Sequence, residues 1–440
     1  MKKTLKELLN KKTVILDGAT GTNLQKRGLP GGVCPEQWVL EHKEVMIELQ
    51  KAYVEAGSDV LYAPTFSGNR IKLKEYGLQD SVSEMNKALV AVCKEAAGDQ
   101  VLVAGDMTMT GQQLMPLGTL SFDELLACYK EQAKALDEAG VDLFVVETMM
   151  SLQETRAAVL AIRDVSVKPL MVTMTFETNG RTLYGTDPVT ALVTLQEMGI
   201  DAFGINCSAG PDTLLPHIRA MKRYAKVPLV AKANAGLPML VDGETVFPMQ
   251  PDEFAAATEK LIENGASIVG GCCGTGPAHI KALSQTAAAL PKTVVSDVPE
   301  VTWQAVTTER KTYDFENGFD HLEIGTHITA SKCPELIEDF KEGMFDTLYD
   351  LLDEEACEEP DIICVDIDAE DEDYDPCEIV GELISELSSA AAPIAFSTLD
   401  MKLLDKYLKL YPGRALVKYK EGSNIKNVEA LAVKYGAVVI

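Results

Sequence analysis

The chain lacks any apolar run long enough to span a membrane. A membrane-spanning helix needs roughly 20 consecutive apolar residues, and no stretch of the 440 residues approaches that length. The first apolar run, Val14 to Leu16, is also too short for the core of a secretory signal. The chain holds ten cysteines. Since it shows no such secretory signal, we expect these cysteines to be reduced thiols of a cytoplasmic protein rather than a secreted disulfide scaffold.

Basic residues are scarce. Only 40 Lys and Arg residues stand against 67 Asp and Glu residues, which gives a net charge of −27. Such a surface repels phosphate backbones and anionic lipid headgroups, so neither nucleic acid nor membrane is an expected partner. Part of the acidic excess is concentrated between Asp353 and Asp375. We expect a solvated loop there, with a metal or partner site as the alternative.

The chain also has no G-x-G-x-x-G turn and no P-loop, which argues against an open nucleotide-binding sheet. Instead, short β-rich apolar runs alternate with helical stretches over the first 290 residues. The eight runs are Thr13 to Leu16, Asp59 to Ala63, Val101 to Ala104, Leu143 to Val146, Leu170 to Thr175, Ala202 to Ile205, Pro228 to Ala231, and Ser267 to Val269. Eight buried strands, each followed by a helix, predict a closed (β/α)8 TIM barrel in an α/β protein.

The chain is too long for one hydrophobic core, since cores stop growing at about 250 to 300 residues. We therefore predict a barrel over residues 1–290, a linker over 291–317 without clean periodicity, and a second unit over 318–440. In that unit five strand-like runs alternate with helical stretches, which predicts a smaller α/β domain resembling half a barrel. The runs are Leu322 to Ile324, Ile362 to Val365, Pro393 to Phe396, Ala415 to Val417, and Ala437 to Ile440.

Three cysteines end strands of the predicted barrel, where active sites of this fold lie. Cys207 follows the sixth strand, and Cys272 and Cys273 follow the eighth. Three thiolates would hold a zinc ion and leave a fourth position open for substrate. We expect the glycines around the vicinal pair to permit backbone angles that turn both sulfur atoms to one point. Taken alone, the pair could instead be structural or redox-active.

A thiol that enters the open position would lose its proton near neutral pH and become a nucleophile for alkyl transfer. If that thiol belongs to an amino acid, its ammonium group needs acidic partners. Asp17 and Glu147 end the first and fourth strands and suit this role. A turn residue is the alternative for Asp17, and a salt bridge to a neighbouring helix is the alternative for Glu147. Asn206 and Asn234 could orient ligands from behind, or merely cap turns.

A series of motifs carries a resemblance to a known family. They are Leu16 to Thr22, Ala56 to Val60, Val146 to Thr148, Gly204 to Cys207, Ala233 to Pro238, and Val269 to Thr275. Together they resemble the homocysteine S-methyltransferase family, and within it the homocysteine-binding module of cobalamin-dependent methionine synthase. The resemblance implies a (β/α)8 barrel, zinc on the three cysteines, and homocysteine contacts from Asp17 and Glu147.

Residues from about 320 to 440 resemble the opening half of the folate-binding barrel that follows this module in the full synthase. Thr326 and His327 stand where that domain usually has Glu-Arg, and Cys364, Asp366 and Lys418 also depart from its pattern. Half a barrel cannot surround a pterin. We therefore expect no methyltetrahydrofolate binding, and a docking or dimerisation surface that could support a homo-oligomer.

These observations predict a zinc-dependent enzyme that transfers a methyl group to homocysteine and yields methionine. Cys207, Cys272 and Cys273 are the predicted metal ligands and catalytic residues, and Asp17, Glu147 and Asn234 the predicted substrate-binding residues. The expected donor is a separate methylated corrinoid protein, so cobalamin would act only through that partner. The alternatives are a small donor such as S-methylmethionine, adenosylmethionine or betaine, or a non-catalytic scaffold subunit.

Overall fold

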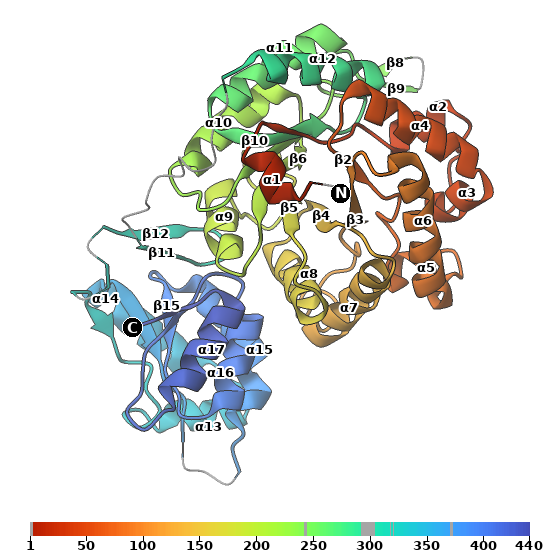
Figure 1. The fold of residues 1–440 in the computed structure, drawn as a ribbon. Helices are drawn as coiled ribbons and strands as arrows, with labels where there is room; N and C mark the ends of the chain where they lie inside the picture. Colours follow the sequence, from red (N-terminus) through yellow and green to blue (C-terminus); the bar gives the residue numbers. More distant parts are fainter. Residues whose placement is uncertain (1–2, 242–243, 292–303, 317, 320, 370–372) are drawn as a thin grey trace. The chain divides into compact units, whose positions relative to one another are not determined.

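The computed structural model describes residues 3–241, 244–291, 304–316, 318–319, 321–369 and 373–440 (Figure 1). The described chain divides into two compact units. The first comprises residues 3–112, 123–192 and 200–291, and the second comprises 113–122, 193–199 and 304–440. Within the described residues, no helix is both long and apolar enough to cross a membrane.

The first unit is built on eight parallel strands in the order β1-β10-β7-β6-β5-β4-β3-β2. Their bounds are Val14–Ile15 (β1), Val60–Tyr62 (β2), Leu102–Met107 (β3), Leu143–Met149 (β4), Leu170–Met174 (β5), Ala202–Cys207 (β6), Leu229–Ala233 (β7), and Ala266–Gly271 (β10). A parallel bridge between Leu16 and Val60 joins the two ends of this row. The sheet therefore closes on itself, which confirms the predicted (β/α)8 barrel.

Helices connect successive strands and form the outer ring. The connecting helices are α2 (Gly21–Lys26), α3 (Pro35–Glu41), α4 (Lys43–Ala56), α5 (Arg70–Lys74), α6 (Val82–Ala97), α7 (Phe122–Glu138), α8 (Leu152–Val165), α9 (Pro188–Gln196), α10 (Pro211–Lys222), α11 (Pro251–Glu263) and α12 (Pro277–Ala289). Helix α4 shows why the sequence is sufficient here: its buried residues Met46, Leu49 and Tyr53 recur at helical spacing. Gly57 then ends the helix in the left-handed conformation.

The barrel interior is apolar at one end and polar at the other. Inward-facing Val145 and Val230 belong to an apolar layer, which Leu5 and Leu8 of α1 (Leu5–Leu9) cover from below. Helix α1 lies across the opening of the ring in Figure 1. Side chains on a strand alternate between its faces, so the residues two positions further along also point inward. At those positions stand buried polar residues, namely Asp106, Glu147, Thr173 and Lys232.

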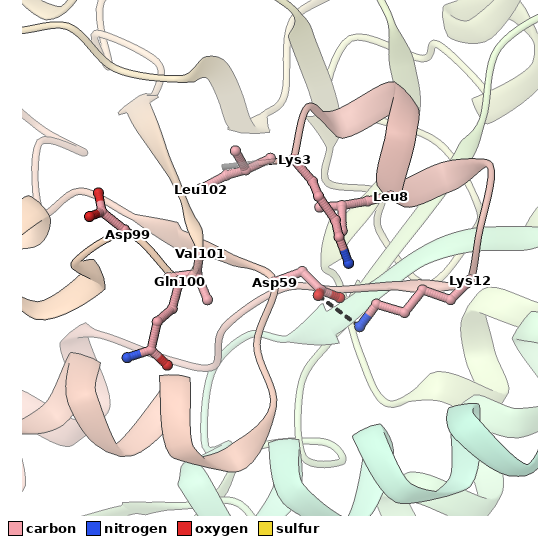
Figure 2. A pocket seen from close by; sticks show the side chains of 8 residues that line it. All are labelled: Lys3, Leu8, Lys12, Asp59, Asp99, Gln100, Val101 and Leu102. Carbon is pink, nitrogen blue, oxygen red and sulfur yellow. Dashed lines mark ion pairs between the residues drawn. The ribbon is translucent and has the colours of Figure 1, made fainter. Parts of the chain in front are cut away.

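A small cavity of about 190 Å³ lies at the apolar end, beside α1 (Figure 2). Lys12 forms a 2.7 Å ion pair there with Asp59, which directly precedes β2. Val101 and Leu102, at the start of β3, also line this cavity. Because these residues stand at the N-terminal ends of the strands, the cavity is at the opposite end of the barrel from the three cysteines.

The second unit contains a five-stranded parallel sheet in the order β13-β14-β15-β16-β17, as the sequence predicts. The strands are Ile324–Gly325 (β13), Ile362–Val365 (β14), Ile394–Phe396 (β15), Leu416–Val417 (β16) and Val438–Val439 (β17). The helices are α13 (Glu335–Lys341), α14 (Asp346–Glu358), α15 (Pro376–Glu386), α16 (Met401–Leu410) and α17 (Ile425–Tyr435).

Two sequence-based expectations need correction. The segment expected as a linker lies partly outside the described residues, but 304–315 holds an antiparallel hairpin, β11 (Gln304–Thr307) with β12 (Thr312–Phe315). The acidic run from Asp353 is also not simply a loop, because it contains the end of α14 and all of β14. Helix α14 begins before this run, where Leu348, Leu351 and Leu352 form its apolar stripe, and it continues to Glu358 although acidic residues dominate its last turns.

Candidate metal and substrate site

The structure brings together the sulfur atoms of Cys207, Cys272 and Cys273. All three Sγ atoms lie within 4.8 Å of one another, and those of Cys207 and Cys273 are 3.9 Å apart. Zinc binds thiolate sulfur at about 2.3 Å, so two sulfur atoms on a tetrahedral zinc ion stand about 3.8 Å apart. All three cysteines are free and partly accessible. The trio therefore has the spacing of three sulfur ligands on one metal ion.

The backbone around these cysteines is specialised, although not quite as the sequence suggested. Gly274 has a positive φ of 81° and Cys207 itself has φ 58°, a region that non-glycine residues seldom occupy. Gly270 and Gly271, by contrast, have ordinary angles and are needed for space. A Cβ at Gly270 would overlap the side chain of Leu16, and one at Gly271 would overlap the side chain of Thr275. The glycines before the cysteine pair thus permit close packing rather than unusual backbone angles.

Hydrogen bonds fasten the end of β10 to the segment that follows β1. The Thr275 hydroxyl donates to the carbonyl of Cys272 at 2.7 Å and accepts from the backbone N–H of Ala19 at 3.1 Å. The side-chain amide of Asn23 donates to the carbonyls of Thr275 and Ala19, both at 2.8 Å. The first and last of the recognised motifs therefore form one continuous support beneath the cysteine pair.

The two asparagines have different surroundings. Asn234 is close enough to Cys207 to favour its thiolate and so lower the pKa of that thiol, against the effects that raise it. The buried Oδ1 of Asn234 has no hydrogen-bond partner among the described residues. Asn206 instead joins β6 to β4: its Oδ1 accepts from the Thr148 N–H at 2.9 Å, and its Nδ2 donates to the Thr148 hydroxyl at 2.8 Å. Thr148 has φ 60°. Asn206 thus holds the strained Thr148, which directly follows Glu147. Asn206 also directly precedes Cys207 in the chain.

A buried lysine lies between the two carboxylates that the sequence singled out. The Nζ of Lys232, on β7, is 3.4 Å from Glu147 and 3.9 Å from Asp17. It also lies over the ring of Tyr62, 4.4 Å from the ring centre. Asp17 accepts a 2.8 Å hydrogen bond from the Tyr62 N–H. Asp17 and Glu147 therefore lie together with Lys232 and Tyr62 in one buried polar region, called the chamber below. The predicted carboxylates thus already face a positively charged side chain, that of Lys232.

The chamber carries more acidic than basic groups. Asp106 projects from β3 into the same interior, so three carboxyl groups accompany one ammonium group. Burial raises the pKa of Asp17 to about 7, against the attraction of Lys232. Burial and repulsion from Glu147 raise the pKa of Asp106 well above its ordinary value. Burial lowers the pKa of Lys232, but Glu147 and Asp17 outweigh this effect and raise it well above the ordinary value.

Several polar atoms in the chamber lack hydrogen-bond partners among the described residues. These atoms are Asp17 Oδ1, Tyr62 OH, Asp106 Oδ1, Thr173 Oγ1 and Asn234 Oδ1. An unsatisfied buried polar group costs about 1 to 3 kcal/mol, so such a concentration indicates groups prepared for a polar ligand. These unpartnered atoms make the chamber a candidate site for a small molecule that offers hydrogen-bond donors and a positive charge.

Lys232 was not among the residues predicted for the site, and Asp106 had no predicted role. Lys232 stands between two alanines in an apolar strand. A single lysine in such a sequence is ordinarily interpreted as the end of the strand, with its side chain in solvent. The alternation of side chains along β7 could have identified Lys232. Lys232 is two residues after the inward-facing Val230 and therefore points to the same face of the strand. Asp106 has the same relation to the inward-facing Ala104 on β3.

The sequence of this chain is similar to those of known proteins. A family model described as homocysteine S-methyltransferase matches residues 14–287. The methionine synthase of Mycobacterium tuberculosis (strain ATCC 25618 / H37Rv) is 29% identical over 471 residues, covering 99% of this chain. The methionine synthase of Mycobacterium leprae (strain TN) is also 29% identical, over 477 residues and 99% of this chain. The chain spans only 38% of the length of either relative.

Solved structures share the fold of the first unit. The oxidized form of the homocysteine methyltransferase MmuM from Escherichia coli superposes with a TM-score of 0.54 at 23% identity, covering 64% of this chain and 98% of that one. The metallated form of the same protein gives a TM-score of 0.54 at 22% identity, covering 64% and 99%. Because the family model matches well over half of the residues, this chain belongs to the homocysteine S-methyltransferase family of methyltransferases.

Proposed function

We propose that this chain transfers a methyl group to the thiol of homocysteine, with zinc held by Cys207, Cys272 and Cys273. The observation that carries the proposal is the convergence of three sulfur atoms within 4.8 Å at the C-terminal end of the barrel. The family to which the chain belongs supports the reaction type. The similarity to methionine synthases supports methionine as the product.

The chemistry of the donor set fits zinc. Without a metal, the hydrogen bond with Cys207 and then burial raise the pKa of Cys272 to about 12. Three neighbouring thiols would thus keep their protons at neutral pH, and a soft divalent cation is what converts such a cluster into thiolates. When bound, zinc lowers the pKa of a further coordinating thiol, which makes that thiol a nucleophile near neutral pH.

The chain's own residues would bind and orient the amino-acid part of the substrate. Glu147 offsets the charge of Lys232, and an ammonium group that enters beside Asp17 would lower the pKa of that carboxyl and keep it ionised, so the chamber favours an ammonium group over a carboxylate. An entering ammonium would supply hydrogen bonds to acceptors that lack them, above all Asp17 Oδ1. Asn234, which favours the thiolate form of Cys207, would help to hold that sulfur in its ionised form.

The methyl donor in this proposal is a methylated corrinoid on a separate protein, and the reaction takes place in the cytoplasm. The resemblance of the motifs to the homocysteine-binding module of cobalamin-dependent methionine synthase supports this donor. A small donor such as S-methylmethionine, adenosylmethionine or betaine would make the same product. The donor is therefore tested separately from the acceptor.

The central test measures methionine formation by the purified full chain with homocysteine and methylcobalamin, and in parallel with each small donor. We expect about one zinc per chain and turnover with methylcobalamin. Turnover with one small donor alone would retain the acceptor and reject the corrinoid. Absence of zinc and of homocysteine binding would reject the proposed function and favour a scaffold subunit.

A matched set of variants tests the ligands. In Cys207→Ser we expect both zinc and activity to be lost, because a neutral serine hydroxyl replaces one of three thiolates. Cys128→Ser is the control, since Cys128 is buried on α7 away from the trio. A Cys207→Ser protein that keeps zinc and activity would remove Cys207 from the site. If Cys272 and Cys273 were instead a dithiol redox pair, the unsubstituted chain would be active without bound zinc.

A further inference from the structure

The last turn of α14 carries carboxylates at the end of a helix that disfavours them. Glu354, Glu355 and Glu358 occupy that turn, and the turn holds no basic residue. The helix dipole places partial negative charge at this end, so each carboxylate there is destabilised and a cation is stabilised. Such an unfavourable arrangement is expected where a bound group compensates for it.

One imidazole lies against this turn. His327, two residues after β13, places Nδ1 3.3 Å from Glu354 Oε2 and Nε2 3.1 Å from Glu358 Oε2. Glu354 and Glu358 are four residues apart and therefore neighbours on one helix face. Within the described residues these three glutamates have no Lys or Arg ion-pair partner. Even a protonated His327 would leave the cluster with an excess of negative charge.

The third carboxylate is buried beneath the other two. Glu355 is 0% exposed, and its Oε1 accepts a 2.7 Å hydrogen bond from the backbone N–H of His327. Its Oε2 has no partner within the described part of the chain. A side chain at Gly325 would overlap this carboxylate, so the glycine reserves the space that Glu355 occupies. A simple ion pair between His327 and Glu358 does not account for this buried, half-satisfied carboxylate.

We propose that His327, Glu355 and Glu358 form a second metal site, distinct from the three cysteines. One donor atom from each of the three lies within 4.8 Å of the other two. A mixed set of imidazole nitrogen and carboxylate oxygen is typical of divalent transition-metal ions, whereas calcium and magnesium prefer oxygen alone. Three protein ligands leave positions for water. The site would stabilise the end of α14 against β13 within the second unit.

Manganese is a suitable probe, because it prefers oxygen and nitrogen donors and competes poorly for thiolates. The full chain, with its cysteine site loaded with zinc, is titrated with Mn²⁺ while the free ion is measured by electron paramagnetic resonance. We expect one saturable site per chain. Glu358→Gln and His327→Gln should each weaken binding by at least about tenfold, because each removes one of three ligands.

The control is Asp350→Asn on the same helix, which removes one negative charge from an exposed residue outside the cluster. It should leave the Mn²⁺ dissociation constant within about twofold, because its charge is screened and lies about 12 Å along the helix from Glu358. Glu358 is 63% exposed, so its substitution is not expected to unfold the unit. No saturable binding by the unsubstituted chain, or equal binding by all three variants, would overturn the proposal.

Discussion

At the scale of single residues, Lys232 is the side chain on which the polar chamber depends. It is buried and faces Glu147 at 3.4 Å and Asp17 at 3.9 Å. Removing one partner of a buried ion pair costs about 3 to 5 kcal/mol, because the remaining charge is left uncompensated. The acids can relieve this cost by taking up protons when the pH is low enough.

We therefore predict that Lys232→Met lowers the free energy of unfolding, and more at pH 8 than at pH 6. Urea unfolding at the two pH values measures this difference. Lys281→Met, a change of the same kind on the exposed face of α12, should have no effect beyond about 0.5 kcal/mol. Equal losses at both pH values would mean that Lys232 acts through packing and not through charge.

Asp17 gives a second prediction, on pH dependence. Its pKa is raised to about 7 in the folded chain from an ordinary value of 3.8. Between about pH 4 and 7 the folded chain therefore keeps a proton that the unfolded chain releases. Raising the pH through this window removes stability, by at most about 1.4 kcal/mol per pH unit.

Asp17→Asn cannot ionise, so its unfolding free energy should fall less between pH 5 and pH 8 than that of the unsubstituted chain. At pH 8 the variant should be the more stable of the two and yet bind homocysteine more weakly, because the ammonium loses a charged partner. Chemical denaturation and isothermal titration measure the two effects. Parallel pH profiles for the two proteins would contradict the raised pKa.

At the scale of elements, the ends of β1 and β10 support the cysteine pair through Thr275. A side chain at Gly271 would overlap that threonine, which binds both Cys272 and Ala19. We predict that Gly271→Ala costs about 1 to 3 kcal/mol by overpacking and weakens zinc retention against a chelator. Unfolding and zinc release are the measurements.

Gly21→Ala is the matched control. Gly21 begins α2, has open space where a Cβ would lie, and does not have a positive φ. Its substitution should be neutral or stabilising by up to about 1 kcal/mol. Normal zinc retention in Gly271→Ala would show that the close packing of β10 serves the barrel alone.

At the scale of the whole molecule, the second unit has five parallel strands and no closing partner for β13 or β17 among the described residues. At the C-terminal edge of this sheet, Lys420 binds Asp366 at 2.6 Å and Asp368 at 2.9 Å. Lys420 thus forms ion pairs with both Asp366 and Asp368. An open sheet with such an edge offers no enclosed chamber for a pterin.

We predict that the chain does not bind methyltetrahydrofolate. Isothermal titration of the zinc-loaded chain should give no saturable heat at micromolar ligand, whereas homocysteine serves as the positive control for the same preparation. Micromolar binding would contradict the prediction and would indicate that the open sheet still holds a pterin. The predicted docking or dimerisation role is tested independently, by the molar mass in solution.

The sequence alone was sufficient for the alternating strands and helices, because burial and periodicity are local properties of a chain. It was sufficient for the cysteine trio as well, since every parallel strand delivers its C-terminal end to the same rim. Thus Cys207 and Cys272 could be placed together although they are far apart in the chain.

Only the tertiary structure decided which charges meet inside the barrel. Lys232 faces Asp17 and Glu147 because strand tilt and register bring β7, β1 and β4 to one level, and composition does not encode register. The same holds for His327 and Glu355, which come from different elements of the second unit. Periodicity thus determines which face a side chain occupies, whereas the closed packing of strands and helices determines its partners.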